Sequence, residues 1–290
     1  MSLGSLPAGR PAVLKILARA ELSYPRRSVR WVREAVEVAA RPGYTVSVVT
    51  CADDHTGWSP PEVSTGYRMV LVRRGRFRRR ARGGVADVDP TAAYLAELGD
   101  EEQFAHPAGG DVCTSVTFGP DLWRRLAGDR RALSTVYVDG ALDLAHRRAV
   151  AAAADPDYAL AEELLTLVSR AITQPGTGMG RADDRTLVAR AREAIAADDP
   201  AAAGLFPLAE LLAVSPYRLS RAFTREVGVS LTRYRNRVRV GRALDRLEAG
   251  ERRLAVLAAD LGFADQAHLT RVVREHAGRT PAVLRRLLAG

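Results

Sequence analysis

The chain is poor in cysteine and in long apolar runs, and both absences exclude classes of protein. Its 290 residues include two cysteines, Cys51 and Cys113, which are too few for a disulfide scaffold and typical of a reducing compartment. No apolar run approaches the roughly 18 residues of a membrane-spanning helix. Charge interrupts the apolar stretch at residues 11–20, which lacks a clear secretory cleavage site. We therefore expect a cytoplasmic protein with no membrane partner and about two domains.

Lysine is also nearly absent, so arginine carries the basic charge, and this charge is unevenly placed. Residues 185–290 contain 19 Arg against 11 Asp plus Glu, a net charge of +8 out of the formal +9, which leaves +1 for residues 1–184. A basic region joined to a near-neutral one is typical of a nucleic-acid-binding protein, because contacts to phosphates supply much of the affinity. A solvated basic surface is the alternative interpretation.

Short segments rich in β-branched and aromatic residues occur between residues 44 and 138, with Gly, Pro and Asp between them. This pattern predicts a β-sandwich or a small barrel. The predicted strands are residues 44–50, 67–73, 77–80, 84–88 and 112–118. The arginine-rich stretch 73–80 is expected to form a hairpin around Gly75 with its arginines on a solvated sheet face, and a second nucleic-acid patch is the alternative.

The pattern becomes helical after Asp139. Residues 141–154 are rich in alanine, and residues 157–172 place apolar side chains on one side of a helix. The residues of this stripe are Leu160, Leu164, Leu167, Val168 and Ile172. The stripe must be buried, either on its own domain or on the same helix of a second copy, which would make a homodimer. Gly and Pro at 174–180 predict a linker, so we expect domains at 1–173 and 185–290 joined by 174–184.

A short pattern occurs twice in the last third of the chain, with the copies 50 residues apart. The first copy consists of Ala209, Leu211, Leu219, Arg221 and Gly228. The second copy consists of Ala259, Leu261, Leu269, Arg271 and Gly278. Each copy begins with a short apolar helix, here predicted at 208–213 and 254–261, and continues after a break with a second helix. This arrangement predicts two helix-turn-helix units.

The second helix of each unit is expected to contact DNA. Ser215 and Pro216 begin it in the first unit as N-cap and first helical residue, and Asp265 caps it in the second. The outward-facing residues are Tyr217, Arg218, Ser220, Arg221 and Arg225 in the first unit, and Gln266, His268, Thr270, Arg271 and Arg274 in the second. Arginine pairs well with guanine and glutamine with adenine, whereas Arg218 and Arg225 suit phosphates. For His268, an exposed position without a role is the alternative.

A helix of good helix formers is predicted between the two units at residues 231–249, with Ser230 as its cap and Gly250 as its stop. At ~1.5 Å per residue it spans roughly 28 Å, close to the ~34–36 Å between successive major grooves. One monomer could therefore place both recognition helices on one face of a duplex, with a slight bend in the DNA. Arg235 and Arg237 on this helix are expected to contact phosphates.

Residues 215–228 and 261–281, with a Gly-Phe turn at 262–263, two Leu-x-Arg cores and a terminal Gly-x-Thr-Pro, resemble the DNA-binding domain of AraC/XylS-type transcription regulators. The resemblance covers residues 185–290. It implies DNA contacts from Tyr217, Ser220 and Arg221 in the first unit and from Gln266, His268, Thr270 and Arg271 in the second.

The resemblance also implies the rest of the architecture. Family members of this length usually carry an N-terminal cupin-like β-barrel that binds a small effector, followed by a helical dimerisation segment. The expected fold is therefore α+β, with that barrel and segment followed by an all-α domain of two helix-turn-helix units joined by a long helix. By family analogy the protein is an activator whose partners are double-stranded DNA, a small-molecule effector and RNA polymerase.

A cupin enzyme fused to a DNA-binding domain is a weaker alternative. Its metal site needs two or three histidines and a carboxylate and usually begins with His-x-His. The chain has five histidines and no His-x-His, and only His55 and His106 lie in the β region. We therefore expect neither enzymatic activity nor a cofactor.

A metal- or redox-sensing regulator is the other alternative. The residues Cys51, His55, His106 and Cys113 are of zinc-binding types and lie near predicted strand ends. Two semi-buried thiols and two surface histidines are the simpler interpretation, and a reversible disulfide between the cysteines is a third. For an organic effector, the candidate stacking residues are Trp58, Tyr67, Phe77 and Phe104, and an ordinary core position is the alternative for each.

Overall fold

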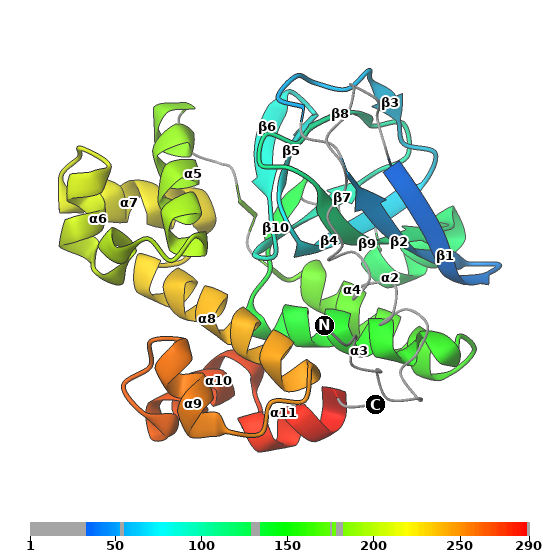
Figure 1. Ribbon diagram of the computed structural model, residues 1–290. Coiled ribbons are helices and arrows are strands. Elements are labelled where there is room, and N and C mark those ends of the chain that lie inside the picture. Colours follow the sequence, from blue (N-terminus) through cyan, green and yellow to red (C-terminus); the bar gives the residue numbers. More distant parts are fainter. Residues whose placement is uncertain (1–32, 53–54, 129–133, 175, 178–181, 289–290) are drawn as a thin grey trace, which may run out of the picture.

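The computed structural model describes residues 33–52, 55–128, 134–174, 176–177 and 182–288 of the protein. They form an α+β protein, with a β-domain followed by an all-α domain (Figure 1). This is the predicted fold class. Within the described ranges, no helix is long and apolar enough to cross a membrane.

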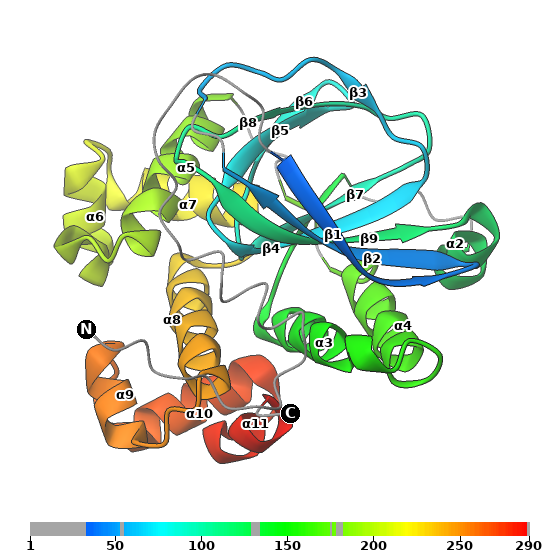
Figure 2. The ribbon, with the colours of Figure 1, turned by 45° about the vertical axis from the view of Figure 1, so that its right-hand side comes forward.

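Two antiparallel sheets build the β-domain and face each other as an open barrel (Figure 2). The six-stranded sheet has the order β1-β2-β9-β4-β7-β10, and the four-stranded sheet has the order β3-β8-β5-β6. The strands are β1 (Arg33–Arg41), β2 (Tyr44–Cys51), β3 (Glu62–Val63), β4 (Tyr67–Arg74), β5 (Phe77–Ala81), β6 (Gly84–Val88), β7 (Ala92–Ala96), β8 (Glu101–Ala105), β9 (Asp111–Phe118) and β10 (Thr135–Tyr137). All five predicted strands are present.

The predicted hairpin around Gly75 is wrong. β4 pairs with β7 and β9, whereas β5 pairs with β6 and β8, so the chain changes sheets at this point. Gly75 has a φ of 75°, and a Cβ there would lie 2.3 Å from the Gly110 carbonyl oxygen, so this corner requires glycine.

The prediction that the arginines of residues 73–80 lie on a solvated sheet face is also only half correct. Residues along β5 alternate between buried and exposed. Arg79 is 2% exposed and its Nε lies 2.6 Å from Oε1 of the buried Glu102. Arg78 and Arg80 instead point outward and flank the Trp58 ring.

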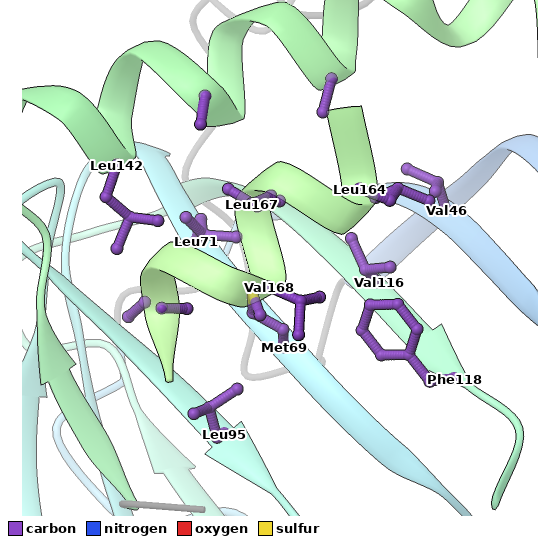
Figure 3. Close-up of a cluster of buried hydrophobic side chains, with 14 of the residues drawn as sticks. Val46, Met69, Leu71, Leu95, Val116, Phe118, Leu142, Leu164, Leu167 and Val168 are labelled. Carbon is purple, nitrogen blue, oxygen red and sulfur yellow. The ribbon is translucent and has the colours of Figure 1, made fainter. Parts of the chain in front are cut away.

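Three helices cover the outer face of the six-stranded sheet: α2 (Pro120–Ala127), α3 (Gly140–Ala151) and α4 (Ala159–Ala171). A short 3-10 turn at Ala152–Ala154 follows α3. The apolar stripe of α4 faces Met69, Val116 and Phe118 on the sheet (Figure 3). Its residues Leu160 and Leu167 are fully buried. Of the two predicted burial sites for the stripe, the structure therefore shows the one on the protein's own domain.

The all-α domain contains α5 (Ala182–Ala196), a 3-10 turn at Pro200–Ala203, α6 (Leu205–Leu211), α7 (Pro216–Val227), α8 (Leu231–Glu248), α9 (Leu254–Asp260), α10 (Gln266–Ala277) and α11 (Pro281–Leu288). The long helix α8 begins at its Ser230 cap, as predicted. Its first half packs with α5–α7 through Tyr234, and its second half packs with α9–α11 through Val240 and Leu244 (Figure 1). One rigid helix thus belongs to both helix-turn-helix units.

The two units do not repeat at a single offset. The recognition helices α7 and α10 are 50 residues apart, as predicted, but α6 and α9 are 49 residues apart. Buried Ala209 therefore corresponds to buried Ala258, and the predicted match with Ala259 is wrong because Ala259 is exposed. The second unit has one extra residue in its turn.

Candidate nucleic-acid interface

The first recognition helix, α7, is oriented by its cap and its apolar face. The Ser215 side chain accepts a hydrogen bond from the Arg218 backbone N–H at 3.2 Å, which satisfies one of the free donors at the helix start. Leu219 and Phe223 are completely buried against the rest of the unit. These constraints leave the opposite face of α7 on the surface, and this is the face that the sequence predicts for DNA contact.

Two of the predicted base-contacting residues on α7 are held together. Tyr217 is 69% exposed, and its hydroxyl accepts a hydrogen bond from Arg221 Nη1 at 2.6 Å. The Arg221 guanidinium also lies 5.4 Å from the Tyr217 ring centre. Arg218 is exposed and Ser220 is half-buried beside them. This pairing restricts the Arg221 side chain before any DNA arrives, which lowers the entropy cost of ordering it on binding.

Arg225, predicted to contact phosphate, has a protein partner. Its Nη1 lies 2.9 Å from the Asp184 carboxylate on α5. This pair is partly exposed, so a phosphate contact of Arg225 would have to replace the contact with Asp184.

The second recognition helix, α10, repeats the construction with a different cap. Asp265 Oδ1 accepts a hydrogen bond from the His268 backbone N–H at 2.7 Å. Leu269, Val272 and Val273 form the buried face. Gln266, Arg271 and Arg274 are exposed and line one surface hollow with the half-buried Thr270. The structure therefore brings four of the five predicted residues of this unit together.

His268, the fifth predicted residue, stabilises the turn before α10. Its Nδ1 accepts a hydrogen bond from the Ala264 backbone N–H at 3.2 Å, and its ring packs edge-on against Phe263 with the ring centres 5.5 Å apart. Because Nδ1 accepts, the proton of the neutral ring is on Nε2. His268 therefore has one donor, its Nε2–H, left for a contact with DNA. The contacts with the turn already fix the position of this ring.

The prediction that Arg237 contacts phosphates is wrong. Arg237 is 1% exposed, and its Nε donates to the Val138 carbonyl oxygen at 2.7 Å. Its Nη2 donates to the Pro90 carbonyl oxygen at 3.0 Å. Arg235 donates to the Ala203 carbonyl oxygen and is half-buried. The helical pattern placed these arginines among exposed ones, but the β-domain covers the side of α8 that carries Arg237.

Arg237 belongs to an ion-pair cluster between the two domains that the sequence analysis missed. Asp143 on α3 lies 3.1 Å from Arg237 Nη2 and 3.0 Å from Arg147 Nε. Arg147 Nη1 in turn reaches Glu248 on α8 at 2.7 Å. Burial alone would raise the pKa of Asp143, but Arg147 and Arg237 outweigh it and hold that pKa far below its usual range. Asp143 and Arg147 lie one turn apart on α3, but Arg237 and Glu248 lie far along the chain, so no local pattern could have revealed the cluster.

The β-domain encloses a cavity of about 520 Å³ between its two sheets. Phe77 and Phe104, two of the four predicted effector-binding aromatics, line it. Trp58 does not, because it packs between two arginines on the barrel surface, and Tyr67 instead stacks on Trp123 under the helices. Polar groups on the cavity wall include Arg68, Tyr94, Asp111, Ser115 and Thr117.

The predicted cysteine and histidine residues gather at this cavity. Cys51, His106 and Cys113 line it and are all buried, so the interpretation of His106 as a surface histidine is wrong. His55 is half-buried, and its ring centre lies 5.2 Å from that of His106. No disulfide joins Cys51 to Cys113, so the structure does not contain the alternative of a disulfide between them. Asp111, which was not predicted, joins the group.

Comparison with known proteins gives one family match and several distant structural likenesses. A family described as a helix-turn-helix domain matches residues 208–287. No curated protein matches the sequence significantly. The C-terminal domain of AraT, a response regulator from Geobacillus stearothermophilus, is 29% identical, with 34% of this chain and 84% of that chain covered and a TM-score of 0.33.

Two further solved structures are more distant in sequence. ToxT from Vibrio cholerae is 10% identical, with 86% of this chain and 100% of that chain covered and a TM-score of 0.34. A cupin superfamily protein from Desulfitobacterium hafniense is 19% identical, with 41% of this chain and 98% of that chain covered and a TM-score of 0.29. Because these TM-scores are low, the assignment rests on the family match and on the geometry of the helices.

The matched segment begins within α6 and ends in α11, so it contains both recognition helices and the helix that joins them. Residues 208–287 are therefore a helix-turn-helix domain.

Proposed function

We propose that the protein is a cytoplasmic, sequence-specific transcription regulator in which one monomer contacts two adjacent DNA sub-sites. The observation that carries the proposal is the duplicated recognition helix on a shared support. α7 and α10 have the same length, are each capped by a side chain, and bury the same face. Both pack on α8, which is 18 residues long and spans roughly 27 Å. This support suits recognition helices that enter successive major grooves.

The two sub-sites are expected to differ in sequence. Arg221 corresponds to Arg271, but Tyr217 and Ser220 in the first unit stand where the second has Ala267 and Thr270. Gln266 at the start of α10 suits adenine, whereas the first unit has Pro216 there, without a donor to offer.

The β-domain is proposed to bind a small-molecule effector in its cavity, a role that involves no catalysis. A volume of about 520 Å³ with aromatic and polar walls is the kind of site that takes a small organic molecule. Activation through RNA polymerase and pairing with a second copy are further proposals that the family resemblance supplies.

In vitro selection of binding sites from random duplexes, followed by footprinting, tests the DNA-binding proposal. We expect selected sites to contain two unlike sub-sites about one helical turn apart, both protected by one monomer. Protection of a single groove turn per monomer would overturn the two-site proposal. Selection that yields no consensus would overturn sequence-specific binding altogether.

A further inference from the structure

We propose that Cys51, His106 and Asp111 bind a divalent transition-metal ion at the wall of the barrel cavity, and that zinc is the best match. The further idea that this metal regulates DNA binding rests on the proposed function. The metal site itself does not depend on that function. Cys51 ends β2 and pairs directly with Asp111 at the start of β9. His106 follows β8, and the cavity reaches all three residues.

The donor atoms of these three side chains are already close. One ligand atom from each residue lies within 4.8 Å of the other two, and all three residues are buried. Ligands around a tetrahedral zinc ion, at ~2.0–2.3 Å from the metal, lie roughly 3.5 Å from one another. Small side-chain rotations would therefore bring sulfur, nitrogen and oxygen to coordination distance.

A chain of hydrogen bonds fixes where the proton of His106 lies. His55 Nδ1 is 2.7 Å from the Gly57 carbonyl oxygen, which can only accept, so Nδ1 carries the proton of the neutral ring. His55 Nε2 is therefore an acceptor, and it lies 3.3 Å from His106 Nδ1. His106 must donate from Nδ1, which leaves a lone pair on its Nε2.

This lone pair faces a second one. His106 Nε2 lies 2.9 Å from Asp111 Oδ1, and among the residues that the structure describes this buried oxygen has no hydrogen-bond partner. Two acceptor atoms at this distance repel each other unless they share a cation. A metal ion would accept both lone pairs and the Cys51 sulfur, whereas a proton would serve only two of the three donors.

The remaining neighbours have the roles expected of residues around a metal site. His55 holds His106 in the tautomer that coordinates through Nε2, as second partners of ligating histidines usually do. The Cys113 thiol donates to Asp111 Oδ2 at 2.8 Å, which orients the carboxylate.

The donor set selects the class of metal and leaves room for a ligand. Thiolate, imidazole and carboxylate together suit zinc, and the Cys51 thiol releases its proton on binding. Three protein ligands leave the fourth tetrahedral position open toward the cavity. Water or a donor atom of the effector would occupy that position.

Cobalt titration of the chelator-treated, full-length protein tests the site. We expect one Co²⁺ per chain, with a near-ultraviolet thiolate-to-cobalt absorption band that Zn²⁺ abolishes. Cys51→Ser should remove the band, and His106→Gln or Asp111→Asn should weaken Co²⁺ binding at least tenfold. His55→Gln should keep the band and weaken binding about 10–100-fold.

Cys113→Ser is the matched control, because it removes the other buried thiol but no proposed ligand. It should keep the band and the stoichiometry. The proposal is overturned if the parent shows no saturable band, or if the band depends on Cys113 and survives Cys51→Ser with the far-ultraviolet circular dichroism unchanged.

Binding of a selected DNA site, measured on the same samples with and without Zn²⁺, separates the site from its role. A change in DNA affinity of tenfold or more that Cys51→Ser abolishes supports a metal signal. An unchanged DNA affinity would overturn the proposed regulatory role of the metal. The cobalt band would still establish the metal site. Absence of any DNA binding would contradict the proposed function alone.

Discussion

Arg237, at the middle of the helix shared by both recognition units, donates a 2.7 Å hydrogen bond to the carbonyl oxygen of Val138 in the β-domain. Val138 directly follows β10 and precedes Asp139, the N-cap of α3, and α3 itself packs against α8, α10 and α11. The contact therefore joins the segment between β10 and α3 to α8, the helix that sets the spacing of α7 and α10. A change in the β-domain would therefore have a short physical route to the recognition helices through this contact.

Asp143→Asn should strongly destabilise the protein. Asp143 is 6% exposed and neutralises both Arg147 and Arg237, so its loss leaves two buried guanidinium groups without their shared carboxylate. Removing one partner of a buried ion pair costs about 3–5 kcal/mol. The free energy of unfolding in urea at pH 7 measures the effect.

Asp245→Asn is the control for this prediction. Asp245 lies 2.9 Å from the same Arg147, but its side chain is 58% exposed. Water already screens that pair, so we expect a loss of about 1 kcal/mol or less. Equal losses for the two variants would contradict the role given to Asp143.

Arg221→Ala and Arg271→Ala should each weaken binding to a selected DNA site by about 1–3 kcal/mol. Each should also relax the base preference in one sub-site only, because the two arginines lie on different recognition helices. Fluorescence anisotropy with duplexes mutated in one sub-site at a time measures both effects. Arg125→Ala, which removes an exposed arginine of α2, is the control and should leave the base preference unchanged.

Substitutions in the turns of the two units should change the free energy of unfolding in opposite directions. Ala213 and Gly262 occupy the equivalent left-handed position, with φ of 55° and 68°. A Cβ is unfavourable there by roughly 1–2 kcal/mol. Ala213→Gly should therefore raise the free energy of unfolding, and Gly262→Ala should lower it, as measured by thermal denaturation. A Cβ at Gly262 would also approach Arg239 Nη2 to 2.9 Å, which adds to the loss expected there. The same sign for both substitutions would show that side-chain contacts outweigh the backbone at one of the two positions.

Local chemistry explains which parts of the structure the sequence predicts. Ser215 and Asp265 cap α7 and α10 as expected, because capping depends only on residues within one turn. β2 and β9 follow from their β-branched residues. β7 was missed because its sequence, Ala92–Ala96, is mostly alanine and its pairing partners lie far along the chain.

The residues of the candidate sites also divide into those that the local sequence predicts and those that it does not. The exposed face of α10 could be predicted from helical periodicity, but Arg237 could not, since its partners are carbonyl oxygens of the β-domain. Cys51 and His106 were recognised by residue type, whereas Asp111 became a candidate only when the pairing of β2 with β9 placed it opposite Cys51. Sheet register, which no local pattern specifies, assembles that group.

Stability should fall in mild acid because of His146. This residue is 2% exposed on α3, and its Nε2 lies 2.7 Å from Thr114 Oγ1. Burial, aided by Arg73 and opposed by Asp143, lowers the pKa of His146 to about 3, against ~6.5 in the unfolded chain. Between these values the unfolded state binds the extra proton, so stability is complete above pH 6.5 and declines as the pH falls.

Urea unfolding at pH 7 and pH 5 of the parent and of His146→Gln measures this contribution. At ~1.4 kcal/mol per pH unit, the parent should lose about 2 kcal/mol more than the variant over this range. Glutamine keeps a polar group near Thr114 but does not titrate, so the comparison isolates the proton. His276, whose pKa burial also lowers, is present in both proteins and cancels. Equal losses in the two proteins would mean that His146 is not held neutral by the fold.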